Sequence, residues 1–156
     1  MKTLQIAGYK NTGKTTLILD YVQLLKQYGY TVAIIKHHHM TEDVENSTDT
    51  GRFFEAGADY TSFNMPGHSV MLEQPEKPLT VQLQRFQNEG VDFVLVEGYK
   101  NENYSKIILT YSFTEGGTDI NEIGLTNVLN RFDMRYDKDN AMNWFKEWSN
   151  IGNENV

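Results

Sequence analysis

The sequence of 156 residues contains no cysteine. Disulfides, thiolate metal sites and cysteine nucleophiles are therefore excluded. Long apolar runs are also missing, since no stretch approaches the roughly 18 apolar residues of a membrane-spanning helix. The first residues after Met1 read directly as a strand and leave no room for a secretion signal. We therefore expect a cytoplasmic protein that has no membrane partner.

Basic residues are few, because 14 Lys and Arg stand against 21 Asp and Glu, and the formal net charge is −7. A protein that binds nucleic acid needs a basic face to displace counterions, and no such patch is visible in this sequence. We expect no nucleic-acid partner. Any phosphate binding must come from a dedicated loop rather than from the overall charge of the protein.

The composition is that of one globular domain. Apolar residues make up 39% and charged residues 22%, and the length is sufficient to bury a core. The sequence has no internal repeat and no convincing linker. We predict a single nucleotide-binding domain over residues 1–148 and a polar tail over residues 149–156.

Short apolar strands alternate with segments of helical periodicity. Residues 3–7 and 31–35 are predicted strands, and apolar residues recur every three or four positions over 14–28, which predicts a helix ended by Gly29. A strand–helix–strand order implies a parallel pair with a right-handed crossover. Further strands are predicted at 60–63, 68–72, 92–96 and 106–111, helices at 52–58, 80–88 and 141–148, a loop at 37–51, and either state at 122–129.

One motif lies between the first strand and the first helix. Residues 8–15, Gly-Tyr-Lys-Asn-Thr-Gly-Lys-Thr, fit the P-loop pattern G-x-x-x-x-G-K-[ST]. The glycines let consecutive N–H groups face a phosphate, Lys14 carries a positive charge to the β- and γ-phosphates, and the Thr15 hydroxyl can bind Mg²⁺. The predicted phosphate-binding residues are Gly8, Tyr9, Lys10, Asn11, Thr12, Gly13, Lys14, Thr15 and Thr16.

Two carboxylates bracket the strand predicted at 92–96, and only one of them can approach the phosphates. Asp92 and Glu97 are separated by about 17 Å of extended chain. Ligands of open α/β sheets bind at the carboxyl ends of the strands, where Glu97 lies. We therefore predict Thr15 and Glu97 as the metal-binding residues, with Glu97 holding Mg²⁺ or its water shell.

Lys36 and three histidines, residues 37–39, follow the second strand at its carboxyl end. Only alternate side chains of an extended chain share a side, and His68 is the one other histidine, so a complete zinc set is not evident. Three interpretations stay open: a loop that faces substrate or phosphate through Lys36 and His37, a solvated polar loop, and a metal site.

These features together predict an α/β fold, P-loop NTPase-like, with a mostly parallel sheet flanked by helices. A β-rich excursion around residues 61–72 and 106–114 is expected to project and to mediate self-association. The side chains expected at that interface are Met65, Met71, Tyr104 and Tyr111.

The ordered motifs resemble those of the molybdopterin-guanine dinucleotide biosynthesis protein B family, MobB. The resemblance covers roughly residues 1–110 and rests on the P-loop, Lys36-His37, Asp49-x-x-Arg52, residues 55–58 (Glu-Ala-Gly-Ala) and residues 95–100 (Leu-Val-Glu-Gly-Tyr-Lys). It implies a dimeric GTP-binding accessory protein of molybdenum cofactor maturation. The resemblance implies two partners, the enzyme that attaches GMP to molybdopterin and molybdopterin itself.

The segment from Lys36 to Arg52 is predicted to face the reacting end of the nucleotide. Lys14, Glu97, Asp49 and Arg52 are the candidate catalytic residues. Arg52 is expected to bind a phosphate, and Asp49 either to orient Arg52 or to approach the Mg²⁺ shell. The plain alternative is a surface ion pair between Asp49 and Arg52. The family usually carries a basic residue just before this aspartate, and the present sequence lacks it.

The nucleotide and the reaction are less well defined by the sequence. A typical Asn-Lys-x-Asp motif for guanine is absent, so GTP follows from the resemblance alone. A small-molecule kinase that uses ATP is one alternative, although the four arginines form no cluster of the kind that neutralises a transferred phosphoryl group. A nucleotide-responsive binding module without useful catalysis is the other.

Overall fold

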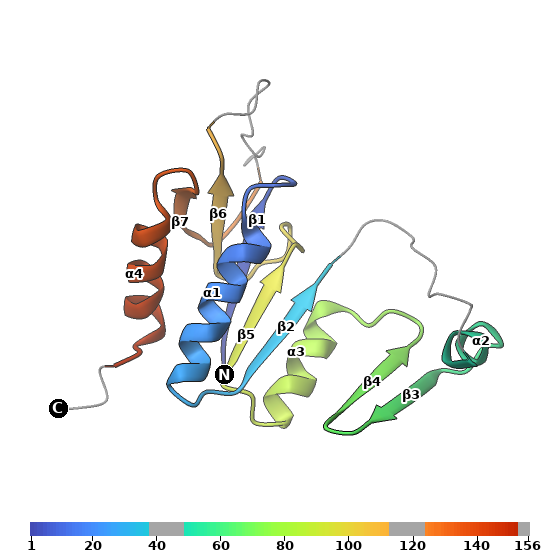
Figure 1. The fold of residues 1–156 in the computed structure, drawn as a ribbon. Coiled ribbons are helices and arrows are strands. Elements are labelled where there is room, and N and C mark those ends of the chain that lie inside the picture. The colour runs from blue at the N-terminus through green and yellow to red at the C-terminus, as the bar shows by residue number, and fades with distance from the viewer. Residues whose placement is uncertain (38–48, 113–123, 153–156) are drawn as a thin grey trace. The chain divides into compact units, whose positions relative to one another are not determined.

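The computed structural model describes residues 1–37, 49–112 and 124–152. These residues form two compact units (Figure 1). The sheet unit comprises Met1–His37 and Leu83–Val156, and the hairpin unit comprises His38–Gln82. No helix in the described ranges is long and apolar enough to cross a membrane.

The sheet unit is built on five parallel strands in the order β2-β5-β1-β6-β7. Strand β1 pairs with β5 on one side and with β6 on the other, so the first strand of the chain lies in the middle of the sheet (Figure 1). The strands are β1 (Lys2–Gly8), β2 (Val32–Lys36), β5 (Phe93–Glu97), β6 (Lys106–Thr110) and β7 (Val128–Asp133).

Two helices, α1 (Lys14–Gln27) and α4 (Lys138–Ser149), cover one face of this sheet (Figure 1). Their apolar side chains enter one core cluster together with Leu4 and Ile6 of β1. Tyr21 of α1 stacks on Phe145 of α4 with ring centroids 3.7 Å apart, and its hydroxyl donates to the Ala141 carbonyl. The aromatic stack fixes α1, and with it the loop that precedes α1, against the sheet.

The other face of the sheet carries two buried polar side chains. Gln5 donates from Nε2 to the Tyr99 carbonyl, in the connection between β5 and β6. Lys106 is fully buried and donates to the carbonyls of Glu102 and Thr126, each at 2.7 Å. Burial lowers the pKa of the Lys106 ammonium. Both side chains hold connecting segments to the sheet.

The hairpin unit contains α2 (Asp49–Glu55) and two antiparallel strands, β3 (Tyr60–Met65) and β4 (His68–Glu73). Phe63 lies opposite Val70 in the strand register. Helix α3 (Leu79–Asn88) begins in this unit and ends in the sheet unit. The small antiparallel sheet confirms the predicted β-rich excursion over its first segment.

Four sequence predictions differ from the structure. Lys106–Thr110 is β6 of the parallel sheet, not part of the excursion, because its apolar residues pair with β1. Helix α2 begins at Asp49, within the predicted loop, and the rest of that loop from residue 38 lies outside the described residues. Strand β7 occupies Val128–Asp133 rather than 122–129. Ser149 is still helical and Ile151 is buried, although both fall in the predicted tail.

Candidate nucleotide-binding site

The loop between β1 and α1 is shaped by close backbone contacts. A Cβ atom on Gly8, where φ is 153°, would lie 2.6 Å from the Leu109 carbonyl oxygen and 2.7 Å from Thr12 Oγ1. Only glycine fits there, because neither neighbour can withdraw without moving β6 or the loop. The buried Thr12 hydroxyl donates to the Tyr9 carbonyl at 2.9 Å, which closes the loop on itself. The motif glycine therefore has a structural reason in this chain.

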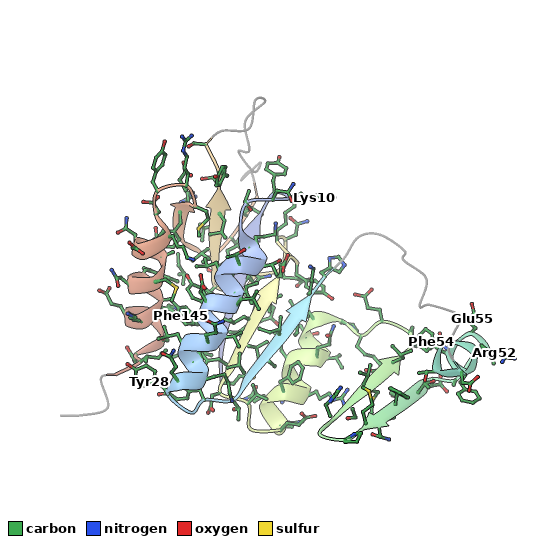
Figure 2. The ribbon with its side chains drawn as sticks, viewed as in Figure 1. Lys10, Tyr28, Arg52, Phe54, Glu55 and Phe145 are labelled. Atoms are coloured by element: carbon green, nitrogen blue, oxygen red, sulfur yellow. The ribbon has the colours of Figure 1, made fainter. Side chains whose placement is uncertain are left out.

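Lys14 opens α1 and its ammonium donates to the carbonyl oxygen of Tyr9, so the side chain folds over its own loop. Burial lowers the pKa of the Lys14 ammonium; the nearby Glu97 carboxylate acts in the opposite direction, and Lys36 adds to the lowering. Lys10 is exposed at the carboxyl end of β1 (Figure 2). A folded-back, partly desolvated cation is well placed to exchange a weak carbonyl acceptor for a phosphate oxygen.

The two predicted metal-binding residues lie next to each other. Thr15 Oγ1 donates to Glu97 Oε2 at 3.0 Å, although the two residues are 82 positions apart in sequence. The contact follows from the strand order, since β5 pairs directly with β1 and Glu97 ends β5 level with Ile6. A hydroxyl and a carboxylate at the end of a P-loop are the hard oxygen donors that Mg²⁺ prefers.

Lys36 and His37 extend this group of side chains on the side of β2. The Lys36 ammonium lies 3.9 Å from Glu97 Oε1, and the His37 amide donates to the Glu97 carbonyl at 2.9 Å. Lys14, Lys36 and Thr15 thus surround one carboxylate at the carboxyl end of β5. The structure brings together the sequence-predicted residues of the sheet unit that concern the metal and the terminal phosphate.

The residues directly after Glu97 form a feature to which the sequence assigned no role. Gly98 has φ 95° and Tyr99 φ 50°, and a Cβ atom on Gly98 would lie 3.2 Å from His37 Cβ. The Tyr99 ring stacks on the His37 ring with centroids 4.3 Å apart, while Gln5 holds the Tyr99 carbonyl. The available signal was a lone polar residue, Gln5, inside an apolar strand.

Asp49 and Arg52 lie in the hairpin unit, on α2. Their side chains are 3.8 Å apart and strongly exposed, 87% for Asp49 and 74% for Arg52 (Figure 2 labels Arg52). The geometry is that of a surface ion pair, which contributes about 0–1 kcal/mol. Their place at the reacting end of a nucleotide stays a prediction.

Transition-metal binding gains no support from the described residues. No group of three or more His, Asp or Glu side chains gathers in a metal-binding cluster within residues 1–37, 49–112 and 124–152. His38 and His39 lie outside the described residues, and His68 begins β4 in the hairpin unit.

Comparison with known proteins assigns the family. A model of the MobB family, described as molybdopterin guanine dinucleotide synthesis protein B, matches residues 3–122. The chain belongs to this family. The resemblance drawn from the motifs is confirmed, and the MobB match extends beyond the last motif on which it was based.

Two curated MobB relatives are named as molybdopterin-guanine dinucleotide biosynthesis adapter proteins. The protein of Haemophilus influenzae is 36% identical over 110 residues, which cover 68% of this chain and 61% of the relative. The protein of Escherichia coli is 34% identical over 111 residues, which cover 68% of this chain and 63% of the relative. The present chain thus matches less than two thirds of the length of either relative.

Solved MobB structures share the fold. A homolog from Bacillus stearothermophilus superposes with a TM-score of 0.68 at 24% identity, covering 96% of this chain and 99% of that protein. Bacillus subtilis MobB gives a TM-score of 0.62 at 24% identity, covering 85% and 77%. The α/β, P-loop NTPase-like architecture predicted from the sequence is confirmed.

Proposed function

We propose that this MobB protein binds GTP with Mg²⁺ at residues 8–16 and hydrolyses it slowly. The observation that carries the proposal is the 3.0 Å contact between Thr15 Oγ1 and Glu97 Oε2 beside a closed P-loop. A glycine turn that binds no ligand does not require a carboxylate from another strand, such as Glu97, next to the hydroxyl of Thr15 in the following helix. A metal–triphosphate site needs both groups at that point.

The donor set fits Mg²⁺ and a triphosphate. Thr15 would bind the ion directly, and Glu97 would hold it or its water shell, in place of the hydrogen bond that now joins them. The ion neutralises charge on the β- and γ-phosphates when bound. The Lys14 ammonium would leave the Tyr9 carbonyl and bind the same phosphates. Lys36 lies next to the other carboxylate oxygen of Glu97, Oε1.

The biological role that we propose is accessory: the protein assists the enzyme that attaches GMP to molybdopterin. The names of the curated relatives, which describe adapter proteins of this pathway, support the role. An adapter that carries a nucleotide site can report the nucleotide state to its partner enzyme. Molybdopterin is a second ligand class in this proposal, because the names of the relatives refer to molybdopterin-guanine dinucleotide and the Lys36 ammonium, 3.9 Å from Glu97, is exposed enough to contact its phosphate.

We also propose that the protein is a homodimer that pairs through the hairpin unit. Phe63 and Val70 form a cross-strand pair, yet 47% and 46% of their surfaces are exposed. An isolated two-stranded hairpin is only marginally stable, so an apolar surface on it calls for a partner. Static light scattering should give twice the monomer mass at micromolar concentration, and Phe63→Asp should lower it while Ser69→Asp should not. A monomeric wild type would contradict the homodimer.

Calorimetric titration tests the nucleotide site. GTP should bind more tightly than ATP and only weakly without Mg²⁺, whereas GDP should depend less on the ion. Equal affinity for GTP and ATP, together with ATP turnover that requires a second hydroxyl-bearing substrate, would instead identify a small-molecule kinase. A variant that binds GTP, does not hydrolyse it and still supports the partner enzyme would identify a binding module without catalysis.

A further inference from the structure

The metal-binding groups lie on one side of the P-loop strand. Glu97 ends β5, Lys36 ends β2, and both strands are on the same side of β1 in the sheet order. With Thr15 and Glu97 at the ion, the terminal phosphate lies toward β5. The α-phosphate, sugar and base of a nucleotide must therefore extend to the opposite side, over the carboxyl ends of β6 and β7.

Among the residues that the structure describes, the turn between β7 and α4, residues 133–137, lies on that opposite side. Figure 1 shows it at the same end of the sheet as the loop between β1 and α1. The turn is fixed to the sheet, because Met134 N–H donates to the Thr110 carbonyl at 2.9 Å. It is also internally braced, since Asp137 Oδ2 accepts from Asp133 N–H at 3.0 Å. A rigid element here can present side chains in fixed directions.

The turn lies against the P-loop itself. The position that a Cβ on Gly13 would occupy is 3.7 Å from both Cβ and Cγ of Met134. A flexible, polarizable thioether side chain beside the last loop glycine suits contact with a sugar or a flat ring. The next two residues, Arg135 and Tyr136, pair with the guanidinium 5.2 Å from the ring centroid, and Tyr136 is 67% exposed. An aromatic ring and a guanidinium are both surfaces on which a base stacks.

Asp133 supplies the polar group of this surface. It is the last residue of β7, level with Thr110, and its Oδ1 accepts from Arg135 N–H at 3.1 Å. That bond orients the carboxylate and uses one of its several lone-pair positions. A carboxylate only accepts, so it matches a base edge that presents two adjacent donors. Guanine presents its ring N–H and 2-amino group in this way, whereas adenine presents one donor next to an acceptor.

The strand register separates Asp133 from its neighbours in sequence. Residues 130–133 read Asn-Arg-Phe-Asp, with the spacing of Asn-Lys-x-Asp but with arginine in the second place. Asn130 is level with Ile107, well inside the sheet, and lies about 10 Å before the end of the strand. Only Asp133 therefore reaches the carboxyl end, where a base would lie.

We propose that the turn between β7 and α4 is the base-binding surface of the nucleotide site, with Asp133 as the residue that selects guanine and Tyr136 as a stacking surface. The proposal rests on the proposed nucleotide site and adds its base-recognition half. It predicts that specificity and phosphate binding are separable, because they lie on opposite sides of β1.

The experiment uses ligands with and without the base. Magnesium tripolyphosphate carries the phosphates alone, GTP adds guanine, and XTP replaces the 2-amino group of guanine by an oxygen. Asp133→Asn should weaken GTP at least tenfold, leave tripolyphosphate unchanged and bind XTP more tightly than wild type does, because an amide N–H can donate to that oxygen. Asp139→Asn, on the exposed first turn of α4, is the matched control and should change none of the three.

Tyr136→Ala is the second variant, and its exposed side chain makes a folding defect unimportant. It should weaken GTP and ATP alike by several-fold and leave tripolyphosphate unchanged. The base-binding surface is overturned if Asp133→Asn keeps wild-type GTP affinity, loses tripolyphosphate equally, or fails to gain XTP. Binding of tripolyphosphate with no discrimination between GTP and ATP would overturn this inference alone. Failure of the wild type to bind tripolyphosphate or GTP would overturn the nucleotide site and this inference together.

Discussion

One carboxylate, Asp92, directly precedes β5 and another, Glu97, ends it, and the two environments are opposite in kind. At the amino end, Asp92 accepts hydrogen bonds from the Thr31 amide and hydroxyl, both at 2.8 Å, and the Asp92 amide donates back to that hydroxyl at 2.9 Å. At the carboxyl end, Glu97 is surrounded by a hydroxyl and an ammonium group from α1 and a second ammonium group from β2. All the hydrogen bonds of the Asp92 carboxylate named here come from one residue, Thr31. Glu97 lies among a hydroxyl and ammonium groups that can also bind a metal ion or phosphate.

The lysines at the two ends differ in the same way. Lys2 donates to the carbonyls of Trp148 and Ser149 at 3.0 and 3.1 Å and lies over the Trp148 ring, which satisfies the last turn of α4. Lys14 donates to one carbonyl of its own loop, that of Tyr9, and lies near a second cation, Lys36. At the amino end, charged side chains and backbone groups satisfy each other's hydrogen bonds, which stabilises the fold. At the carboxyl end, two neighbouring ammonium groups repel each other and are stabilised by binding an anion.

The largest expected effect is on Lys14. Lys14→Ala should weaken binding of magnesium GTP about 100-fold or more, since hydrogen bonds to charged groups are worth about 1.5–3 kcal/mol each. The melting temperature should stay near that of the wild type. Lys2→Ala is the matched control at the other end of the sheet: it should lower the melting temperature and leave the affinity unchanged. Calorimetry and thermal unfolding on both variants test the contrast, and unchanged affinity in a folded Lys14→Ala variant would refute the P-loop site.

The next effect concerns the metal. Glu97→Gln keeps the shape of the side chain but removes the charge, so Mg²⁺-dependent GTP hydrolysis should fall by about 10- to 100-fold. GTP binding should fall less, because Lys14 and the loop amides remain. Hydrolysis measured across a Mg²⁺ titration checks the prediction, with Glu89→Gln, an exposed partner of Arg85, as the control. Equal sensitivity of both glutamates would remove Glu97 from the metal site.

A third charged pair lies outside this comparison, in the hairpin unit. Arg52→Ala and Asp49→Ala should each reduce GTP hydrolysis or cofactor maturation several-fold if α2 serves the reaction. Arg85→Ala is the control, because Arg85 of α3 also forms an exposed ion pair, with Glu89 at 3.2 Å. If Asp49 and Arg52 form only a surface ion pair, removing it should lower the free energy of unfolding by about 1 kcal/mol at most and leave activity unchanged. Wild-type turnover in both α2 variants, measured as phosphate release, would assign Asp49 and Arg52 to the surface.

The sequence predicted those parts of the site that lie within one continuous segment of the chain. The P-loop is a continuous motif between a strand and a helix, and Glu97 follows from the direction of one buried strand. The contacts of Gln5 with Tyr99 and of His37 with Tyr99 were not predicted, because they depend on which strands are neighbours. Sequence periodicity gives the length of a strand but not its place in the sheet.

The same limit explains the errors in the fold. The run at 106–110 is apolar enough for either a central strand or a projecting one, and only pairing with β1 decides between them. Helix α2 is short and contains Gly51, so its first residues carry no helical periodicity. In β7 exposed and partly buried residues alternate and only Phe132 is buried, while the apolar Leu129 is exposed, which obscured the bounds of the strand.

The smallest effect belongs to Asp92. Hydrogen bonds from the Thr31 amide and hydroxyl lower the pKa of the Asp92 carboxyl. A carboxyl whose folded-state pKa is lowered adds stability above its unfolded pKa of about 3.9, and this stability is lost as the pH falls through the folded value. Asp92→Asn should therefore melt slightly below the wild type at pH 7, with the difference vanishing on acidification below about pH 4.

Nucleotide affinity and hydrolysis should be unchanged in Asp92→Asn at neutral pH, because the side chain lies at the far end of β5 from Glu97. Thr31→Val provides a second way to remove the interaction, since it deletes the hydroxyl that both donates to the Asp92 carboxylate and accepts from the Asp92 amide. The double variant should then lose less than the sum of the single variants, because both changes remove the same bond. Additive losses would show that the Thr31 hydroxyl does not stabilise Asp92. A loss of activity in Asp92→Asn would show that the two ends of β5 are not separate in function.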